Sequence, residues 1–150
     1  MDYKKEKQHH ISYCGSYCHI CDWHSGRIRK TFHAAEDALE RYGLKRLLQG
    51  KSDARNMKLG LAILAKSSIC PGCKAEAGQA PGKDRCRIRA CAHARGVDLC
   101  LECRSFPCRL LTSSPGVRKF GCIENLKQIK SGGLKRWVDR QWKEHIRSLS

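Results

Sequence analysis

The sequence has few acidic residues, few aromatic residues and no long hydrophobic run. It contains 14 aspartates and glutamates against 30 lysines and arginines, and aromatic residues make up 7% of its 150 residues. Its longest apolar run lies within residues 59–65, which is far shorter than the roughly 20 residues that cross a bilayer. The charged N-terminus also lacks the apolar stretch of a secretory signal. We therefore expect a cytoplasmic protein without a membrane span.

The sequence also lacks the common catalytic motifs. It has no GxSxG, HExxH or GxGxxG motif, and its acidic residues are scattered, mostly singly. Gly50-Lys51-Ser52 resembles the end of a phosphate-binding loop, but the preceding glycine, Gly43, lies two positions too far away. These absences favour a protein that is not an enzyme and has no small-molecule substrate.

Cysteine is abundant, with 11 residues. In a reducing cytoplasm, closely spaced cysteines are interpreted first as metal ligands and only second as disulfides. In Cys70-Pro71-Gly72-Cys73, proline and glycine are typical of a tight turn that can point both sulfurs at one ion. Ten cysteines are candidate metal ligands in close groups: Cys14, Cys18 and Cys21; Cys70 and Cys73; Cys86 and Cys91; and Cys100, Cys103 and Cys108.

These ten thiolates predict two structural zinc ions. One grouping joins Cys70 and Cys73 with Cys86 and Cys91 in a tetrahedral four-thiolate site, which is closed and therefore structural. Six thiolates remain for a second ion, so a binuclear cluster or free thiols stay open. Two alternatives use the same residues, namely an iron–sulfur redox protein and a thiol or metal-handling protein. The isolated Cys122 is expected to be dispensable.

The formal net charge of +16 predicts a polyanionic partner. A strongly basic protein attracts RNA, DNA or acidic proteins, although a solvated basic surface is the simpler interpretation. The side chains expected to contact phosphate are Arg85, Arg87, Arg89, Arg95, Lys135, Arg136, Arg140 and Lys143.

Hydrophobic periodicity predicts a mainly α fold with little or no β-sheet. Apolar residues recur at steps of three and four, which predicts helices within residues 28–42, 52–66, 87–95, 123–132 and 134–146. The helix within residues 52–66 is expected to bury Met57, Leu61 and Leu64, and residues 113–116 are expected to break the helical structure.

We expect one small domain stapled by metal at zinc-knuckle turns. Residues 1–13 lack apolar periodicity and are expected to form a flexible N-terminal lead-in. Residues 14–111 are expected to form the cysteine-rich metal-binding domain with two core helices. Residues 112–150 are expected to form a basic helical C-terminal extension that packs on this domain.

The order of the cysteines resembles a known family. Its residues are Tyr13-Cys14-Gly15, Cys18, Cys21, Cys70, Gly72-Cys73, Cys86-Arg87-Ile88-Arg89, Cys91-Ala92, Gly96-Val97, Cys100, Cys103, Phe106-Pro107-Cys108 and Leu110, with a helical tail marked by Asn125-Leu126 and Gly133-Leu134. This string resembles the cysteine-rich family called domain of unknown function 3795. The resemblance implies a small prokaryotic zinc-binding protein and implies no known reaction.

Overall fold

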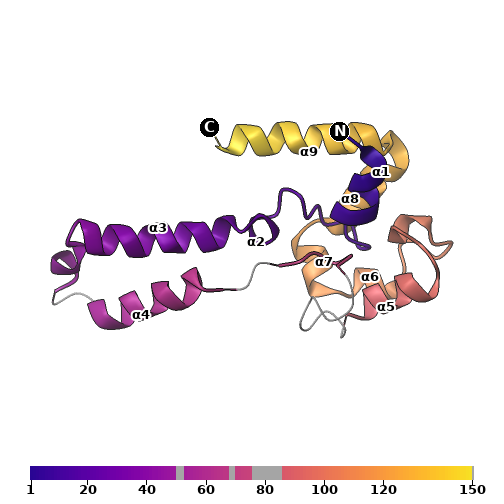
Figure 1. Cartoon of the computed structure of the whole chain (residues 1–150). Helices are drawn as coiled ribbons and strands as arrows, with labels where there is room; N and C mark the ends of the chain where they lie inside the picture. The colour runs from indigo at the N-terminus through magenta and orange to yellow at the C-terminus, as the bar shows by residue number, and fades with distance from the viewer. Residues whose placement is uncertain (50–52, 68–69, 76–85, 150) are drawn as a thin grey trace. The chain divides into compact units, whose positions relative to one another are not determined.

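The computed structural model describes residues 1–49, 53–67, 70–75 and 86–149. Within these ranges the protein is mainly helical, which confirms the predicted fold class, and its β structure is one antiparallel bridge between Ile11 and Tyr17. The chain divides into two compact units (Figure 1). We call Met1–Cys21 with Pro71–Ser150 the larger unit and Asp22–Cys70 the hairpin unit. This division differs from the expected single domain and from its expected internal boundaries.

The hairpin unit is built from two long helices that pack on each other. It contains α2 (Asp22–Ser25), α3 (Arg27–Arg41), the 3-10 helix η2 (Leu44–Leu48) and α4 (Ala54–Ala65). The helix α3 ends before Gly43, whose φ of +57° suits glycine. The helix α4 is capped by Asp53, whose carboxylate accepts hydrogen bonds from the backbone N–H groups of residues 55 and 56. Both helices match the predicted ones.

The predicted buried face of α4 is wrong in part. Met57 is 42% exposed and Leu64 is 39% exposed, whereas Leu61 is half-buried. Two helices packed side by side share one narrow seam, so most of each helix surface faces solvent. Leu39 and Ala65 are the buried apolar side chains among the described residues of this unit. The amphipathic spacing predicted the helix correctly. It overestimated the burial of the helix, because only one neighbouring helix in the described part of the chain covers its apolar face.

The larger unit consists of several short helices and two longer ones, α8 (Cys122–Gly132) and α9 (Leu134–Leu149). Its short helical elements are α1 (Tyr3–Lys5), the π-helix η1 (Glu6–His10), α5 (Arg87–Ala94), the 3-10 helix η4 (Cys100–Glu102), α6 (Arg109–Thr112) and α7 (Pro115–Lys119). The expected break at residues 113–116 is confirmed at residues 113 and 114, between α6 and α7, and is wrong at residues 115 and 116, because Pro115 begins α7. Proline is well suited to the first helical turn, where its missing N–H has no intrahelical partner to lose.

The core of the larger unit depends on α8 and α9. Leu126 and Val138 are fully buried, and Trp137 is 1% exposed. Gly133, with φ of +83°, separates the two helices. Residues 112–150 therefore supply the centre of this unit, and they are not an extension added to a separate cysteine-rich domain.

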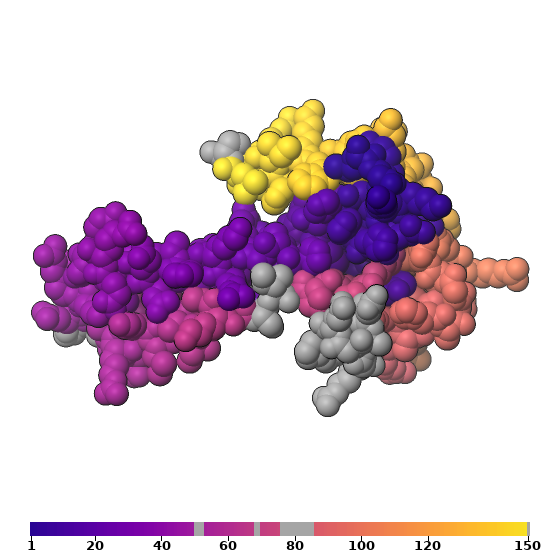
Figure 2. Space-filling model, in the orientation of Figure 1, coloured from indigo at the N-terminus to yellow at the C-terminus, as the bar shows by residue number. Residues whose placement is uncertain are grey.

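Residues 1–13 are not a flexible lead-in. Ile11 is fully buried and pairs with Tyr17, and the Tyr3 hydroxyl donates a hydrogen bond to Asp139 on α9 at 2.8 Å. Figure 2 shows this N-terminal segment, in indigo, against α9, in yellow. Hydrophobic periodicity requires several apolar residues at regular spacing, and this segment buries a single isoleucine. The periodicity therefore could not predict that the segment packs on α9.

In the described part of the chain, no helix is long and apolar enough to span a membrane.

Replacing Trp137 with alanine should destabilise the larger unit strongly. The side chain is 1% exposed, and truncating a buried tryptophan costs about 3–5 kcal/mol. Ile146→Ala, on the same helix but at a 61% exposed position, should change the free energy of unfolding by less than about 0.5 kcal/mol. Urea unfolding followed by circular dichroism measures both, and equal effects would contradict the core described above.

Candidate metal centre

Four cysteines of the larger unit line one small cavity. Cys91, Cys100, Cys103 and Cys108 surround a space of about 30 Å³, together with apolar side chains that include Val97, Phe106 and Leu111. We call this space the cysteine cavity. A volume of about 30 Å³ is close to that occupied by one water molecule, and it is far below the roughly 300–1,000 Å³ of a small-molecule site. The cavity therefore suits a single ion.

These four cysteines lie in or next to three short helices. Cys91 lies in α5, Cys100 begins η4, and Cys108 immediately precedes α6. The Cys100 backbone N–H donates to the Tyr13 carbonyl at 2.8 Å. The Glu102 carboxylate accepts hydrogen bonds from the backbone N–H groups of residues 98 and 99, at 2.9 and 3.3 Å. These bonds fix the turn that carries Cys100 and Cys103.

Two thiols of the cysteine cavity, Cys100 and Cys103, have pKa values shifted in opposite directions. Burial, followed by the charges of neighbouring thiolates, raises the pKa of Cys100 to about 12. The pKa of Cys103 is lowered instead, mainly by a backbone hydrogen bond from Ser105 and also by Arg95, whose Nη1 lies 3.4 Å from the sulfur. A divalent cation would favour the ionised form of every thiol around it.

The cysteine sulfurs that line the cavity do not yet form a complete coordination shell. Within the described ranges, no three thiols have their sulfurs all within 4.8 Å of one another. Side-chain adjustment would therefore accompany binding of an ion in the cysteine cavity. Cysteine has a single side-chain torsion before its sulfur, so a change of rotamer is the smallest adjustment that could move a sulfur toward the ion.

Cys14 and Cys122 form a second pair of interacting thiols, which the sequence analysis missed. Cys122 is 1% exposed, and its sulfur lies 3.1 Å from the Ser16 hydroxyl oxygen. A hydrogen bond with Cys122 lowers the pKa of Cys14, while the same contact and burial raise the pKa of Cys122. Cys122 stands alone in the sequence, so only the packing of α8 could reveal its partner.

Gly15 allows this second pair to form. Its φ is +102°, and a Cβ atom at this position would lie 2.5 Å from the Cys122 carbonyl oxygen and 2.8 Å from Leu126 Cγ. The Asn125 side chain donates to the Gly15 carbonyl at 2.9 Å. Backbone therefore meets backbone where residues 12–16 pack on α8, and a side chain has no room there.

The predicted ligand Cys86 does not line the cysteine cavity. Cys86 is exposed at the start of α5, and Cys91 five residues later is turned roughly 140° around the helix from it. Cys91 lies with Cys100, Cys103 and Cys108, so the proposed grouping with Cys70, Cys73 and Cys86 is not what this packing favours.

Cys70 and Cys73 flank the predicted turn, and Gly72 has the positive φ, +92°, that this turn needs. Cys70 ends the hairpin unit, where its backbone N–H donates to the Trp23 carbonyl at 3.0 Å. Cys18 is buried and Cys21 is half-buried in the larger unit.

Residues 10–113 match the family model described as protein of unknown function (DUF3795). The chain belongs to this family. No curated protein and no solved structure matches it. The segment matched to DUF3795 contains ten of the eleven cysteines, and it excludes Cys122, α8 and α9.

Several arginines predicted to contact phosphate in this DUF3795 member already have protein partners. Arg89 donates to the Ala75 carbonyl at 2.8 Å, and Arg95 donates to Cys103. Arg87 is exposed on α5, whereas Arg85 lies outside the described residues. The remaining four predicted residues are exposed on α9: Lys135, Arg136, Arg140 and Lys143. Two of them also have protein partners, because Arg140 donates a hydrogen bond to Gln128 Oε1 and the Lys135 ammonium lies over the Tyr3 ring.

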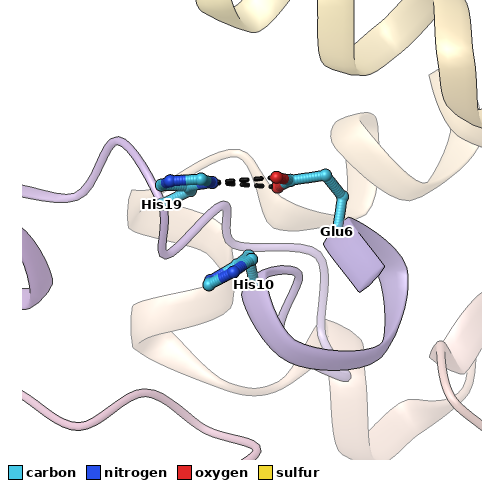
Figure 3. A group of neighbouring side chains, drawn as sticks. All are labelled: Glu6, His10 and His19. Atoms are coloured by element: carbon cyan, nitrogen blue, oxygen red, sulfur yellow. Dashed lines mark hydrogen bonds and ion pairs between the residues drawn. The ribbon is translucent and has the colours of Figure 1, made fainter. Parts of the chain in front are cut away.

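A third group of donor side chains was not predicted. Glu6, His10 and His19 converge in the larger unit, and one ligand atom of each lies within 4.8 Å of the other two (Figure 3). Glu6 precedes the segment matched to DUF3795. No sequence signal marked this group, because its members lie in a segment without hydrophobic periodicity and are separated by four and nine positions.

Replacing Gly15 with alanine should destabilise the larger unit more than the same change at Gly121, where no heavy atom lies within 4 Å of an added Cβ. Both glycines have positive φ, so both variants have a conformational cost of about 1–3 kcal/mol. Only the Gly15 variant adds a clash with α8, which should cost a further 1–3 kcal/mol or so. Urea unfolding of the two variants measures the difference, and equal losses would show that residues 12–16 do not pack tightly.

Proposed function

We propose that this protein is a metal-binding module in which cysteine thiolates hold structural zinc. The observation that carries the proposal is the convergence of Cys91, Cys100, Cys103 and Cys108 on one cavity of about 30 Å³. Four thiolates are a typical ligand set for zinc, which prefers tetrahedral coordination without an open position. The bound ion would stabilise the fold and would leave no position for a substrate.

The donor set fits zinc chemically. Sulfur ligands select soft or borderline metals over magnesium and calcium, which prefer oxygen. Burial of Cys100 makes its thiolate unfavourable in the metal-free protein, and a divalent cation reverses that preference by offsetting the charge. The Arg95 guanidinium, 3.4 Å from the Cys103 sulfur, would then be a hydrogen-bonding partner of a coordinating thiolate.

A second zinc ion would take its ligands from the thiols of the larger unit that do not line the cysteine cavity. The predicted ligands that meet this condition are Cys14, Cys18, Cys21, Cys73 and Cys86. Cys86 is exposed, so we assign the second ion to the remaining four.

Metal content provides the test of the cysteine cavity. Protein purified without oxygen should contain stoichiometric zinc, and Cys100→Ser should lose one zinc per chain and unfold at a lower temperature, because structural metal binding contributes folding free energy. Cys86→Ser is the matched control, since Cys86 is exposed and does not line the cavity. Zinc loss in the control with none in Cys100→Ser would contradict the assignment. Stoichiometric iron and sulfide would instead support an iron–sulfur redox protein.

We further propose that α9 presents a basic face to a polyanion, with RNA as the first candidate. The face of α9 that carries Trp137 and Val138 is buried, while Lys135 and Lys143 are exposed. A hollow of about 260 Å³ between α8 and α9 is lined by Arg136 and Arg140 with four other residues. Two guanidinium groups beside a hollow of this kind are suited to a phosphate group.

Replacing Arg136 with alanine should weaken RNA binding and its dependence on salt. Loss of one phosphate contact should reduce the slope of log affinity against log salt by about 0.7 for single-stranded RNA. Lys66→Ala is the control, because it removes one exposed positive charge from the hairpin unit. Fluorescence anisotropy with a labelled single-stranded RNA measures both variants. An unchanged slope in Arg136→Ala would exclude this hollow as a phosphate site, and binding of an acidic protein would then be tested.

A further inference from the structure

Residues 6–19 fold so that two histidines and one glutamate meet. Glu6 and His10 belong to the π-helix η1, and wide helical turns of this kind are frequent at functional sites. The Ile11 backbone N–H donates to the Glu6 carbonyl at 3.0 Å and closes the turn. The Cys18 backbone N–H donates to the His10 carbonyl at 2.7 Å, which brings the following residue, His19, beside η1.

Glu6 and His19 point toward each other, and the His10 ring lies beside the His19 ring (Figure 3). His19 Nδ1 lies 2.9 Å from Glu6 Oε1 and 3.2 Å from Oε2. The rings of His10 and His19 stack with their centroids 4.3 Å apart. One ligand atom from each residue lies within 4.8 Å of the other two. This spacing is close enough for a single ion to bind all three after small side-chain movements.

The Glu6 carboxylate is held in place from behind. Glu6 is 5% exposed, and its Oε2 accepts a hydrogen bond from the Tyr17 hydroxyl at 2.7 Å. The Tyr17 oxygen in turn accepts a hydrogen bond from Trp142 Nε1, on α9, at 2.8 Å. Such outer hydrogen bonds orient carboxylate ligands in metal sites. A buried carboxylate also needs a compensating positive charge or several hydrogen bonds.

We propose that Glu6, His10 and His19 form a metal site for a divalent first-row ion, with zinc as the preferred occupant. Two imidazole nitrogens and one carboxylate oxygen are a ligand set that zinc uses where it keeps an open position for water. The site differs chemically from the cysteine cavity, because nitrogen and oxygen ligands replace thiolates. Its ion would therefore be exchangeable and able to bind a further ligand, unlike an ion enclosed by four cysteines.

The competing interpretation is a hydrogen-bond network that only anchors residues 6–19 to α9. In that case Glu6, His19, Tyr17 and Trp142 are connected for stability alone. His10 separates the two interpretations, because it stacks on His19 but makes neither of the hydrogen bonds to Glu6. Its loss should remove a ligand while it leaves those hydrogen bonds in place.

The experiment is a cobalt(II) titration of full-length protein, followed by visible and near-ultraviolet absorption. A weak chelator first removes the exchangeable zinc and leaves the thiolate-bound zinc in place, so that the Glu6, His10 and His19 site is empty at the start. The wild type should bind one equivalent of cobalt with weak visible bands and without the intense sulfur-to-cobalt charge-transfer band that thiolate ligands produce. His10→Ala should weaken this binding at least about tenfold, which is the smallest effect expected even for a residue behind a ligand. His9→Ala is the matched control, because His9 is the exposed neighbour outside the group.

Two further measurements keep the outcomes distinct. Glu6→Gln keeps an acceptor for the Tyr17 hydroxyl but removes the anionic ligand, so it should weaken cobalt binding even if it stays folded. Cys100→Ser should leave the affinity of this cobalt site unchanged. This variant therefore tests the cysteine cavity and the Glu6, His10 and His19 site independently of each other. Failure of wild-type protein to bind cobalt in this way, or equal affinity in His10→Ala and wild type, would overturn the proposal in favour of the anchoring network.

Discussion

Residues 12–16 pack directly on α8, and both candidate metal sites depend on that contact. The absence of a side chain at Gly15 lets its backbone approach the Cys122 carbonyl and Leu126. The same segment supplies Cys14 to the pair with Cys122, and the Tyr13 carbonyl binds the Cys100 backbone. The segment then continues into Tyr17 and His19, which contact Glu6. A single close contact thus orders two sets of donor atoms.

The small apolar core explains why metal would matter to this fold. The helices α5, α6 and η4 have eight residues or fewer, and isolated helices of this length are unstable in water. Among the described residues, only a few buried side chains, such as Leu99 and Leu111, stabilise the turns between these helices. A shared ion bound by Cys91, Cys100, Cys103 and Cys108 would join three of these elements at one point, with a free energy large on the scale of domain stability.

Sequence periodicity predicted the long helices and little of what surrounds them. Apolar residues at steps of three and four predicted α3 and α4, because this signal is local. Burial on α4 was overestimated, since it depends on how many neighbours a helix has. Cys122 and His19 gave no usable signal, because each gains its partner only when distant segments pack together.

The two donor sets differ in how they are distributed over the chain. The four thiols of the cysteine cavity all lie within the segment matched to DUF3795. The nitrogen and oxygen group needs Glu6 from before that segment, and its supporting hydrogen bond comes from Trp142 on α9, after it. The thiolate site therefore takes all its ligands from the matched segment, whereas the second site requires the docking of η1 and α9. Metal occupancy at Glu6, His10 and His19 would therefore be coupled to the packing of both flanking segments, because a ligand that binds only the docked state stabilises that state.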